Sequence, residues 1–184
     1  MVYTGITKSE IESIIQKKGD FMQIEYLSDL SRKALPVHVK KFIYLKLANI
    51  YHRKSMFKEE ARIFDLLALN SVAFSERVKY YVKETEVFIR TCRFNEADTT
   101  MKKALREANS IEKEEIYYSI KDFYKKVADD YVKQLKRNSA TKVYEKLLNM
   151  RLTDFEKEKI KERLIELYEK LGRFNEARRL EGLN

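Results

Sequence analysis

The segment Arg93-Phe94-Asn95-Glu96-Ala97 is repeated without change at residues 173–177, which lie 80 residues further along the chain. Each copy follows an amphipathic run of helical length that ends in an aromatic residue, Phe88 before the first copy and Tyr168 before the second. Each copy also opens a further run with helical spacing. Because self-similarity at long period is typical of repeat architectures, this pentapeptide decides the fold that we expect.

Weaker versions of the same frame occur between and before the two identical copies. The frame is an aromatic residue at a helix end, followed about nine residues later by a small or apolar residue in the next helix, as in Tyr131 and Ala140. The second residue recurs at intervals of 37, 36, 43 and 37 residues: Ile24, Ala61, Ala97, Ala140 and Ala177. This regularity predicts one domain over residues 1–184 with five helix-turn-helix hairpins, at about 8–35, 37–70, 75–108, 112–150 and 153–183.

Composition favours an all-α protein. The chain has 4 Gly and 1 Pro, too few for a β protein, which needs a turn signal roughly every 8–12 residues. Charged residues make up 36% and hydrophobic residues 44%, a balance typical of amphipathic helices and not of disorder.

Local patterns predict how individual helices begin and which faces they bury. Ser9 with Glu12, and Thr153 with Glu156, have the spacing of capping boxes. In the second helix, helical spacing places four apolar residues inward: Phe21, Ile24, Leu27 and Leu30. The helix from residue 37 to 54 is apolar on more than one side, so we expect neighbours to cover two of its faces.

Three segments carry the same order of aromatic, apolar and small residues. In the segment 81–105 these residues are Tyr81, Phe88, Phe94, Ala97, Met101 and Ala104. In the segment 124–147 they are Tyr124, Val127, Ala128, Tyr131, Ala140, Tyr144 and Leu147. In the segment 161–184 they are Leu164, Tyr168, Gly172, Phe174 and Ala177. This order resembles the tetratricopeptide repeat over nearly the whole chain, and more closely from Leu47 onward. The resemblance implies a TPR-like α-solenoid: a right-handed superhelix of about five antiparallel helix hairpins, with the first helix of each hairpin lining a concave groove.

The chain departs from the family pattern in its period, which exceeds about 34 residues, and in the middle of the first helix of each hairpin. The residues that replace the family's glycine there are Ala48, Thr85, Ala128 and Ile165. A variant repeat, such as those of vesicle-fusion adaptors or proteasome-lid subunits, is therefore an alternative to the standard one.

The register places cations at two recurring positions that would face the groove. Lys46, Lys83, Lys126 and Arg163 lie five residues before the helix-ending aromatic, and Arg53, Arg90, Lys133 and Lys170 lie two residues after it. Residues seven apart share one helix face, so these eight cations would form two basic rows suited to carboxylates or phosphates. The alternative is a solvated face, because cations are common near helix C-termini.

Two functions remain open at this stage. One is a protein–protein interaction adaptor or scaffold that binds an acidic or amphipathic segment of a protein partner in the groove. The other is a nucleic-acid-associated, and specifically an RNA-associated, basic solenoid, for which the net charge of +9 is the main support. The base-reading code of helical RNA repeats is absent.

An enzyme is not expected, and no cofactor or metal is implied. The two histidines, His38 and His52, have no second ligand at metal-binding spacing, and Cys92 has no base implied nearby. Glycine-rich phosphate loops and hydrolase motifs do not occur.

The expected location is the cytoplasm. No apolar run approaches the length of about 18 residues that a membrane span needs, so no membrane partner is expected. The single cysteine cannot form an internal disulfide, which fits a reducing compartment.

The last predicted helix contains Leu180 and Leu183 and is followed by no polar capping helix. Either this C-terminal end is an interface, for example of a homodimer, or the residual apolar surface is small enough to stay exposed.

Overall fold

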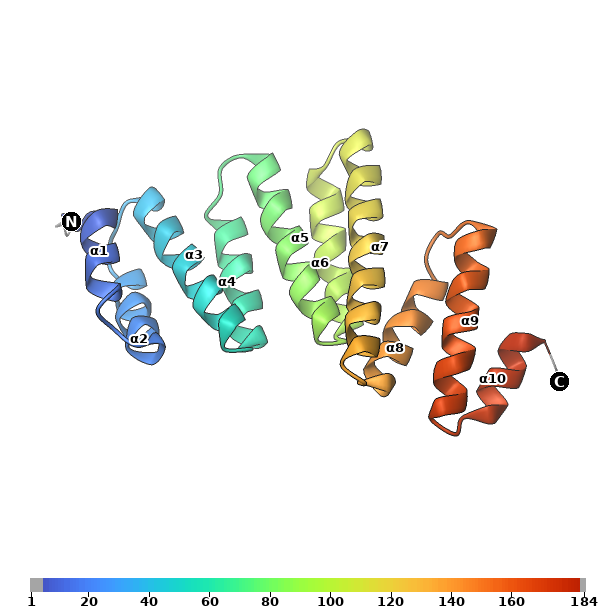
Figure 1. The fold of residues 1–184 in the computed structure, drawn as a ribbon. Helices are drawn as coiled ribbons and strands as arrows, with labels where there is room; N and C mark the ends of the chain where they lie inside the picture. The colour runs from blue at the N-terminus through green and yellow to red at the C-terminus, as the bar shows by residue number, and fades with distance from the viewer. Residues whose placement is uncertain (1–4, 183–184) are drawn as a thin grey trace. The chain divides into compact units, whose positions relative to one another are not determined.

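A computed structural model of the chain describes residues 5–182, and within that range the chain forms ten α-helices and no strand (Figure 1). The helices are α1 (Lys8–Ile15), α2 (Asp20–Ser31), α3 (Val37–Arg53), α4 (Phe57–Leu69), α5 (Phe74–Arg90), α6 (Phe94–Glu107), α7 (Ser110–Lys133), α8 (Arg137–Leu148), α9 (Asp154–Lys170) and α10 (Phe174–Glu181). The all-α prediction is confirmed.

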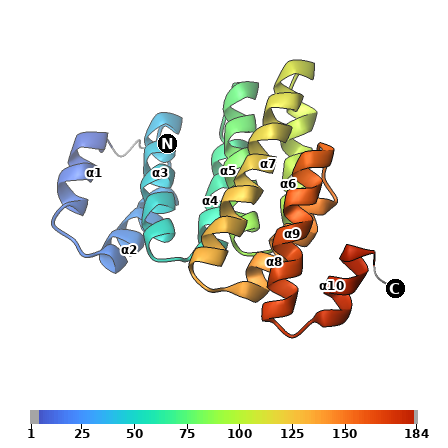
Figure 2. The same cartoon turned by 45° about the vertical axis from the view of Figure 1, so that its right-hand side comes forward.

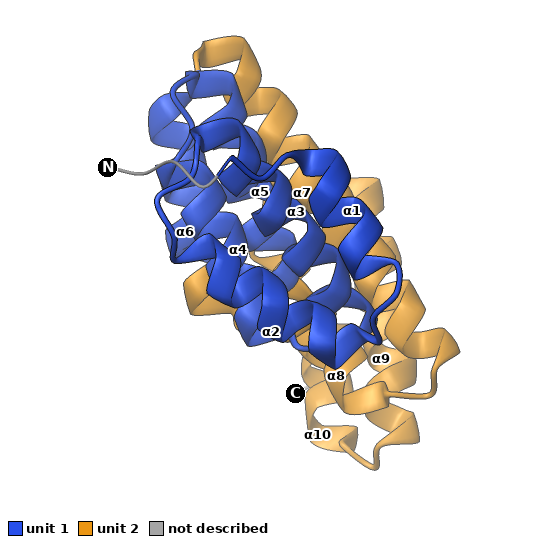
Figure 3. Ribbon diagram, turned by 90° about the vertical axis from the view of Figure 1, so that its left-hand side faces the viewer, with its two compact units in different colours: residues 1–87, 98–108 blue, residues 88–97, 109–184 orange. Residues whose placement is uncertain are grey.

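The chain divides into two compact units (Figure 3). Unit 1 consists of residues 1–87 and 98–108, and therefore contains α1 to α4 with most of α5 and α6. Unit 2 consists of residues 88–97 and 109–184, and contains α7 to α10 with the end of α5 and the start of α6. The expectation of a single domain stays a prediction.

Four helix-to-helix turns share one backbone geometry, one in unit 1 and three in unit 2. In each, the residue four after the helix-ending aromatic has a left-handed backbone: Ser55, Cys92, Leu135 and Gly172, with φ of 56°, 54°, 58° and 72°. The next amide donates to the aromatic residue's carbonyl oxygen: Met56 to Tyr51, Arg93 to Phe88 and Lys136 to Tyr131 at 2.9 Å, and Arg173 to Tyr168 at 2.8 Å. This bond is the six-residue closure of a Schellman motif, and it turns the chain back so that the next helix runs antiparallel.

The repeated pentapeptide makes the same contacts in both copies. Its arginine lies over the preceding aromatic ring, at 4.9 Å for Arg93 over Phe88 and 4.6 Å for Arg173 over Tyr168. The same guanidinium pairs with the glutamate three residues later, at 2.7 Å to Glu96 and 2.8 Å to Glu176. The alanines, Ala97 and Ala177, are 1% and 3% exposed, as expected where helices approach closely.

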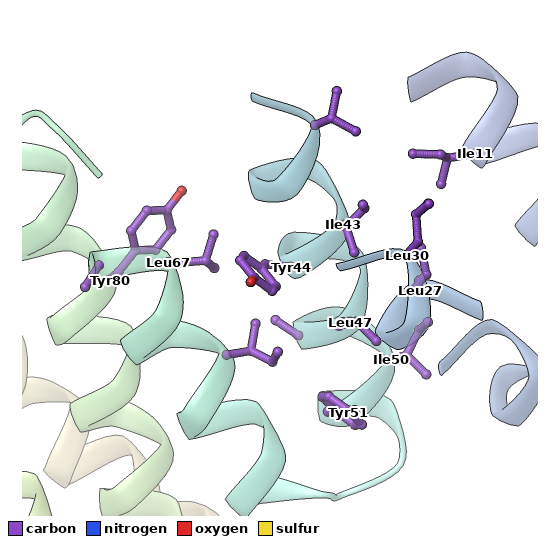
Figure 4. Packing of buried hydrophobic residues seen from close by; sticks show 14 of the residues in the cluster. Ile11, Leu27, Leu30, Ile43, Tyr44, Leu47, Ile50, Tyr51, Leu67 and Tyr80 are labelled. Atoms are coloured by element: carbon purple, nitrogen blue, oxygen red, sulfur yellow. The ribbon is translucent and has the colours of Figure 1, made fainter. Parts of the chain in front are cut away.

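The core of unit 1 is organised around α3, as the two-sided apolar pattern predicts (Figure 4). Ile43, Leu47 and Ile50 point toward α2, where Leu27 and Leu30 are buried. On the other side of α3, Tyr44 points toward Leu67 of α4. In unit 2, apolar residues of α7, α8 and α9 are buried in the same way: Ile116, Ile120, Val127, Val143, Leu147, Ile160, Leu164 and Leu167.

Two local predictions are wrong at the N-terminal end. Thr7, and not Ser9, caps α1, because the Thr7 hydroxyl accepts from the Glu10 amide at 3.3 Å and the Glu10 carboxylate accepts from the Thr7 amide at 2.7 Å. Phe21 is 72% exposed, because it lies in the first turn of α2, with Lys54 over its ring at 5.7 Å. The capping box of Thr153 and Glu156 on α9 is confirmed.

Candidate functional site

Unit 2 contains a groove of about 380 Å³ between α7, α8 and α9. These helices are seen in turned view in Figure 2. The side of the groove on α7 is formed by Lys125 and Asp129, and α8 contributes Tyr144. The side on α9 is formed by residues from three successive turns of the helix: Phe155, Glu156, Lys159, Ile160 and Arg163. The groove therefore combines aromatic, aliphatic and charged groups, as ligand-binding sites commonly do.

The two carboxylates of this groove are already engaged within unit 2. Glu156 accepts from Lys125 at 2.7 Å and from the buried Lys121 at 3.0 Å, and it closes the cap with Thr153. Lys125, followed by the Thr153 amide and Lys121, lowers the pKa of Glu156 to about 2. Asp129 accepts from the Tyr144 hydroxyl at 2.7 Å. Burial first, and this hydrogen bond second, raise the pKa of Tyr144, which keeps the phenol protonated.

The cations on the α9 side are more open to an incoming ligand. Lys159 is exposed, and within residues 5–182 no carboxylate lies within ion-pair distance of it. Arg163 is 55% exposed, and within the described chain its only ion pair is a 3.4 Å contact with Glu166. Beside them Phe155 is 79% exposed. Positive charge thus lies next to exposed apolar surface on one helix face.

Unit 1 has a second groove of about 210 Å³, formed by α1, α2 and α3. Lys46 and Arg53 both line it, together with Asn49. Their charges are compensated, because Lys46 pairs with Glu12 at 2.7 Å and Arg53 pairs with Asp20 at 2.9 Å. This groove is therefore a weaker candidate for binding an anion.

The other predicted cations are placed outside both grooves. Lys83 pairs with Glu86 at 2.8 Å on α5, and the Arg90 guanidinium lies over the Phe123 ring at 5.1 Å. Lys170 is 3.8 Å from Glu166.

Lys126 and Lys133 are exposed and have no ion pair with any residue that the structure describes. They lie on α7 one turn to either side of Asp129, so they flank the groove of unit 2. The structure thus brings Lys46 and Arg53 together in unit 1, and places Arg163 with flanking lysines in unit 2. The arrangement of the eight cations in two continuous rows stays a prediction.

Sequence reasoning missed Phe155 and Lys159, which complete the groove. The signal was present, because these residues precede Arg163 by eight and four positions on the same face of α9. Asp129 and Tyr144 could not be found in this way, since their pairing joins two helices.

Two other side chains with reactive groups, Cys92 and His52, are held in contacts within the chain. Cys92 adopts the left-handed turn position, and burial raises the pKa of its thiol, which disfavours a nucleophilic thiolate. His52 Nδ1 lies 3.1 Å from Glu60 Oε1. In the part of the chain that the structure describes, no cluster of three or more His, Cys, Asp or Glu side chains is placed to hold a metal ion.

Neither unit contains, among its described helices, one long and apolar enough to cross a bilayer. The chain matches no family model, no curated protein and no solved structure.

Proposed function

We propose that this protein is a helical-repeat interaction module whose groove in unit 2 binds a segment of another protein. The segment would carry a carboxylate for Lys159 and Arg163, and a neighbouring apolar side chain for Phe155 and Ile160. One observation supports this proposal most directly. The carboxylates of the groove, Glu156 and Asp129, already have hydrogen-bond partners in unit 2, whereas its α9 cations, Lys159 and Arg163, are exposed.

The same proposal includes the TPR-like resemblance and its right-handed superhelix, which the recurring Schellman turns and buried alanines support. It also includes a cytoplasmic location, for which the single cysteine is the support. Binding is favoured over catalysis because the two carboxylates of the groove are already paired within unit 2.

A peptide display library tests this proposal directly. Its members carry one or two acidic residues beside Leu or Phe, and the protein variant under test is Lys159→Glu with Arg163→Glu. Each lost charged hydrogen bond weakens binding by roughly tenfold or more, so selected peptides should lose about a hundredfold in affinity.

The matched control is Lys157→Glu with Arg178→Glu, which changes the net charge equally at exposed positions outside the groove. Circular dichroism checks that both double variants keep their helix content. If the control weakens peptide binding as much as the groove variant does, the groove is not the site.

Nucleic-acid binding is the second candidate, and the net charge of +9 favours it. It predicts that single-stranded RNA binds, that affinity falls steeply with salt, and that both double variants weaken it similarly, because neutralised phosphates contribute without regard to position. Reversal of Lys126 and Lys133 then matters as much as reversal of the groove cations.

A further inference from the structure

Glu84 is a carboxylate inside unit 1, outside both grooves. It lies in the middle of α5 and is 6% exposed. Its Oε2 atom is buried and has no hydrogen-bond partner among the described residues. An ionised carboxylate is rarely left in this state, because burial without a partner costs it the hydration that the unfolded chain keeps.

The charged groups facing Glu84 from the neighbouring helices are Asp65 of α4 and Lys103 of α6. Lys103 Nζ is committed to Asp65 Oδ1 at 3.0 Å and lies over the Tyr81 ring at 5.3 Å. The Lys103 ammonium therefore faces two carboxylates, and it is paired with Asp65 and not with Glu84.

Burial first, and the charge of Asp65 second, raise the pKa of Glu84 to about 7, against the opposing effect of Lys103. All of these residues belong to unit 1. The geometry and the electrostatics therefore agree that neutral Glu84 fits the closed packing of α4, α5 and α6, and that ionised Glu84 does not.

We propose that Glu84 is a pH-dependent latch that holds α5 against α4 and α6 in unit 1. While Glu84 is protonated, the three helices pack as in the structure. When it loses its proton, the carboxylate must reach water or take Lys103 from Asp65, and either change loosens α5.

The direction of the pH dependence follows from the raised pKa. An ordinary glutamate has a pKa of 4.5, against about 7 for Glu84 in the folded chain. The closed packing is fully stable below pH 4.5, loses stability as the pH rises toward 7, and stays weakened above it. The latch therefore opens as the pH rises from 4.5 to about 7, a range over which the pH of many cellular compartments differs.

Hydrogen exchange of the full-length protein tests the latch. Between pH 5 and pH 8, and after correction for the intrinsic exchange rate, the opening constant of α5 amides in unit 1 should rise by about a hundredfold in the wild type, since each unit of pKa difference is a factor of ten. Glu84→Gln imitates the protonated state and should abolish this rise.

Glu86→Gln is the matched control, because Glu86 is a buried neighbour on α5 whose charge is paired with Lys83. It should follow the wild-type pH dependence. Asp65→Asn removes the like charge and frees Lys103, so it should move the midpoint to lower pH.

A ¹³C-glutamate NMR titration of the wild type gives the answer even if Glu84→Gln does not fold. A carboxyl resonance assigned to Glu84 that titrates near pH 7 supports the latch. A midpoint near 4.5, or an α5 exchange rise that persists in a folded Glu84→Gln protein, overturns it.

Discussion

A left-handed backbone recurs at Ser55, Cys92, Leu135 and Gly172, although only the last of these is a glycine. A side chain at such a position crowds the following carbonyl and costs about 1 kcal/mol. Leu135 is 73% exposed and has little packing to lose. We expect Leu135→Gly to increase the free energy of unfolding by about 0.5–1 kcal/mol, measured by urea denaturation of the full chain.

Gln134 provides the control, since it precedes Leu135 with φ of −82°. There, glycine gives no relief and adds freedom to the unfolded chain, so Gln134→Gly should decrease stability by about 0.5–1 kcal/mol. Equal effects of the two substitutions would contradict the assignment of strain to Leu135.

The sequence predicted the positions of the turns but not the contacts of individual side chains between helices. The repeat located the turns, because the identical pentapeptide follows two of them. The left-handed backbone that Cys92 shares with Gly172 was not predicted, since only one of the two is a glycine. The raised pKa of Glu84 could not be predicted, since it depends on burial and on the charges of Asp65 and Lys103, which lie in other helices. Likewise, Glu12 neutralises Lys46 across 34 residues of sequence. Whether side chains on two different helices form an ion pair depends on how far each side chain extends. The helical periodicity of the sequence does not contain this information.

At the scale of elements, Glu156 connects the start of α9 to α7. It closes the Thr153 cap and accepts from Lys121, whose side chain is 7% exposed. Glu156→Ala removes both roles and should destabilise unit 2 by about 3 kcal/mol, because a nearly buried ammonium loses its counter-ion. Glu156→Gln keeps the cap, since glutamine also serves at this position, and should lose about 1 kcal/mol less. Urea denaturation followed by tyrosine fluorescence measures both.

The same carboxylate gives unit 2 a dependence on acid. Lys125, the Thr153 amide and Lys121 lower the pKa of Glu156 to about 2 from the ordinary 4.5. A lowered pKa contributes stability that is present above pH 4.5 and is lost as the pH falls toward 2. We expect exchange of α9 amides to accelerate over that range in the wild type and to change less in Glu156→Gln. A variant with the wild-type acid profile would show that another carboxylate is responsible.

At the scale of the whole molecule, the helix pattern was the part most open to prediction, because each helix carries its own amphipathic spacing. The division into two units had no such signal: its boundary passes through α5 and α6, where the apolar pattern is uninterrupted. The predicted interface at the C-terminal end rests on Leu180, which is half-buried, and on Leu183, which lies outside the described residues. That interface stays a prediction, and light scattering over a range of concentrations tests it.

The two units also predict how the molecule unfolds. Leu67 of α4 and Leu147 of α8 are both 0% exposed, and they belong to unit 1 and unit 2 respectively. Truncating either to alanine costs about 3 kcal/mol in the surrounding core. Because each unit has its own buried core, Leu67→Ala should accelerate hydrogen exchange in α2 to α4 and spare α8 to α10, while Leu147→Ala should do the reverse. If each variant accelerated exchange equally along the whole chain, the two units would unfold as one.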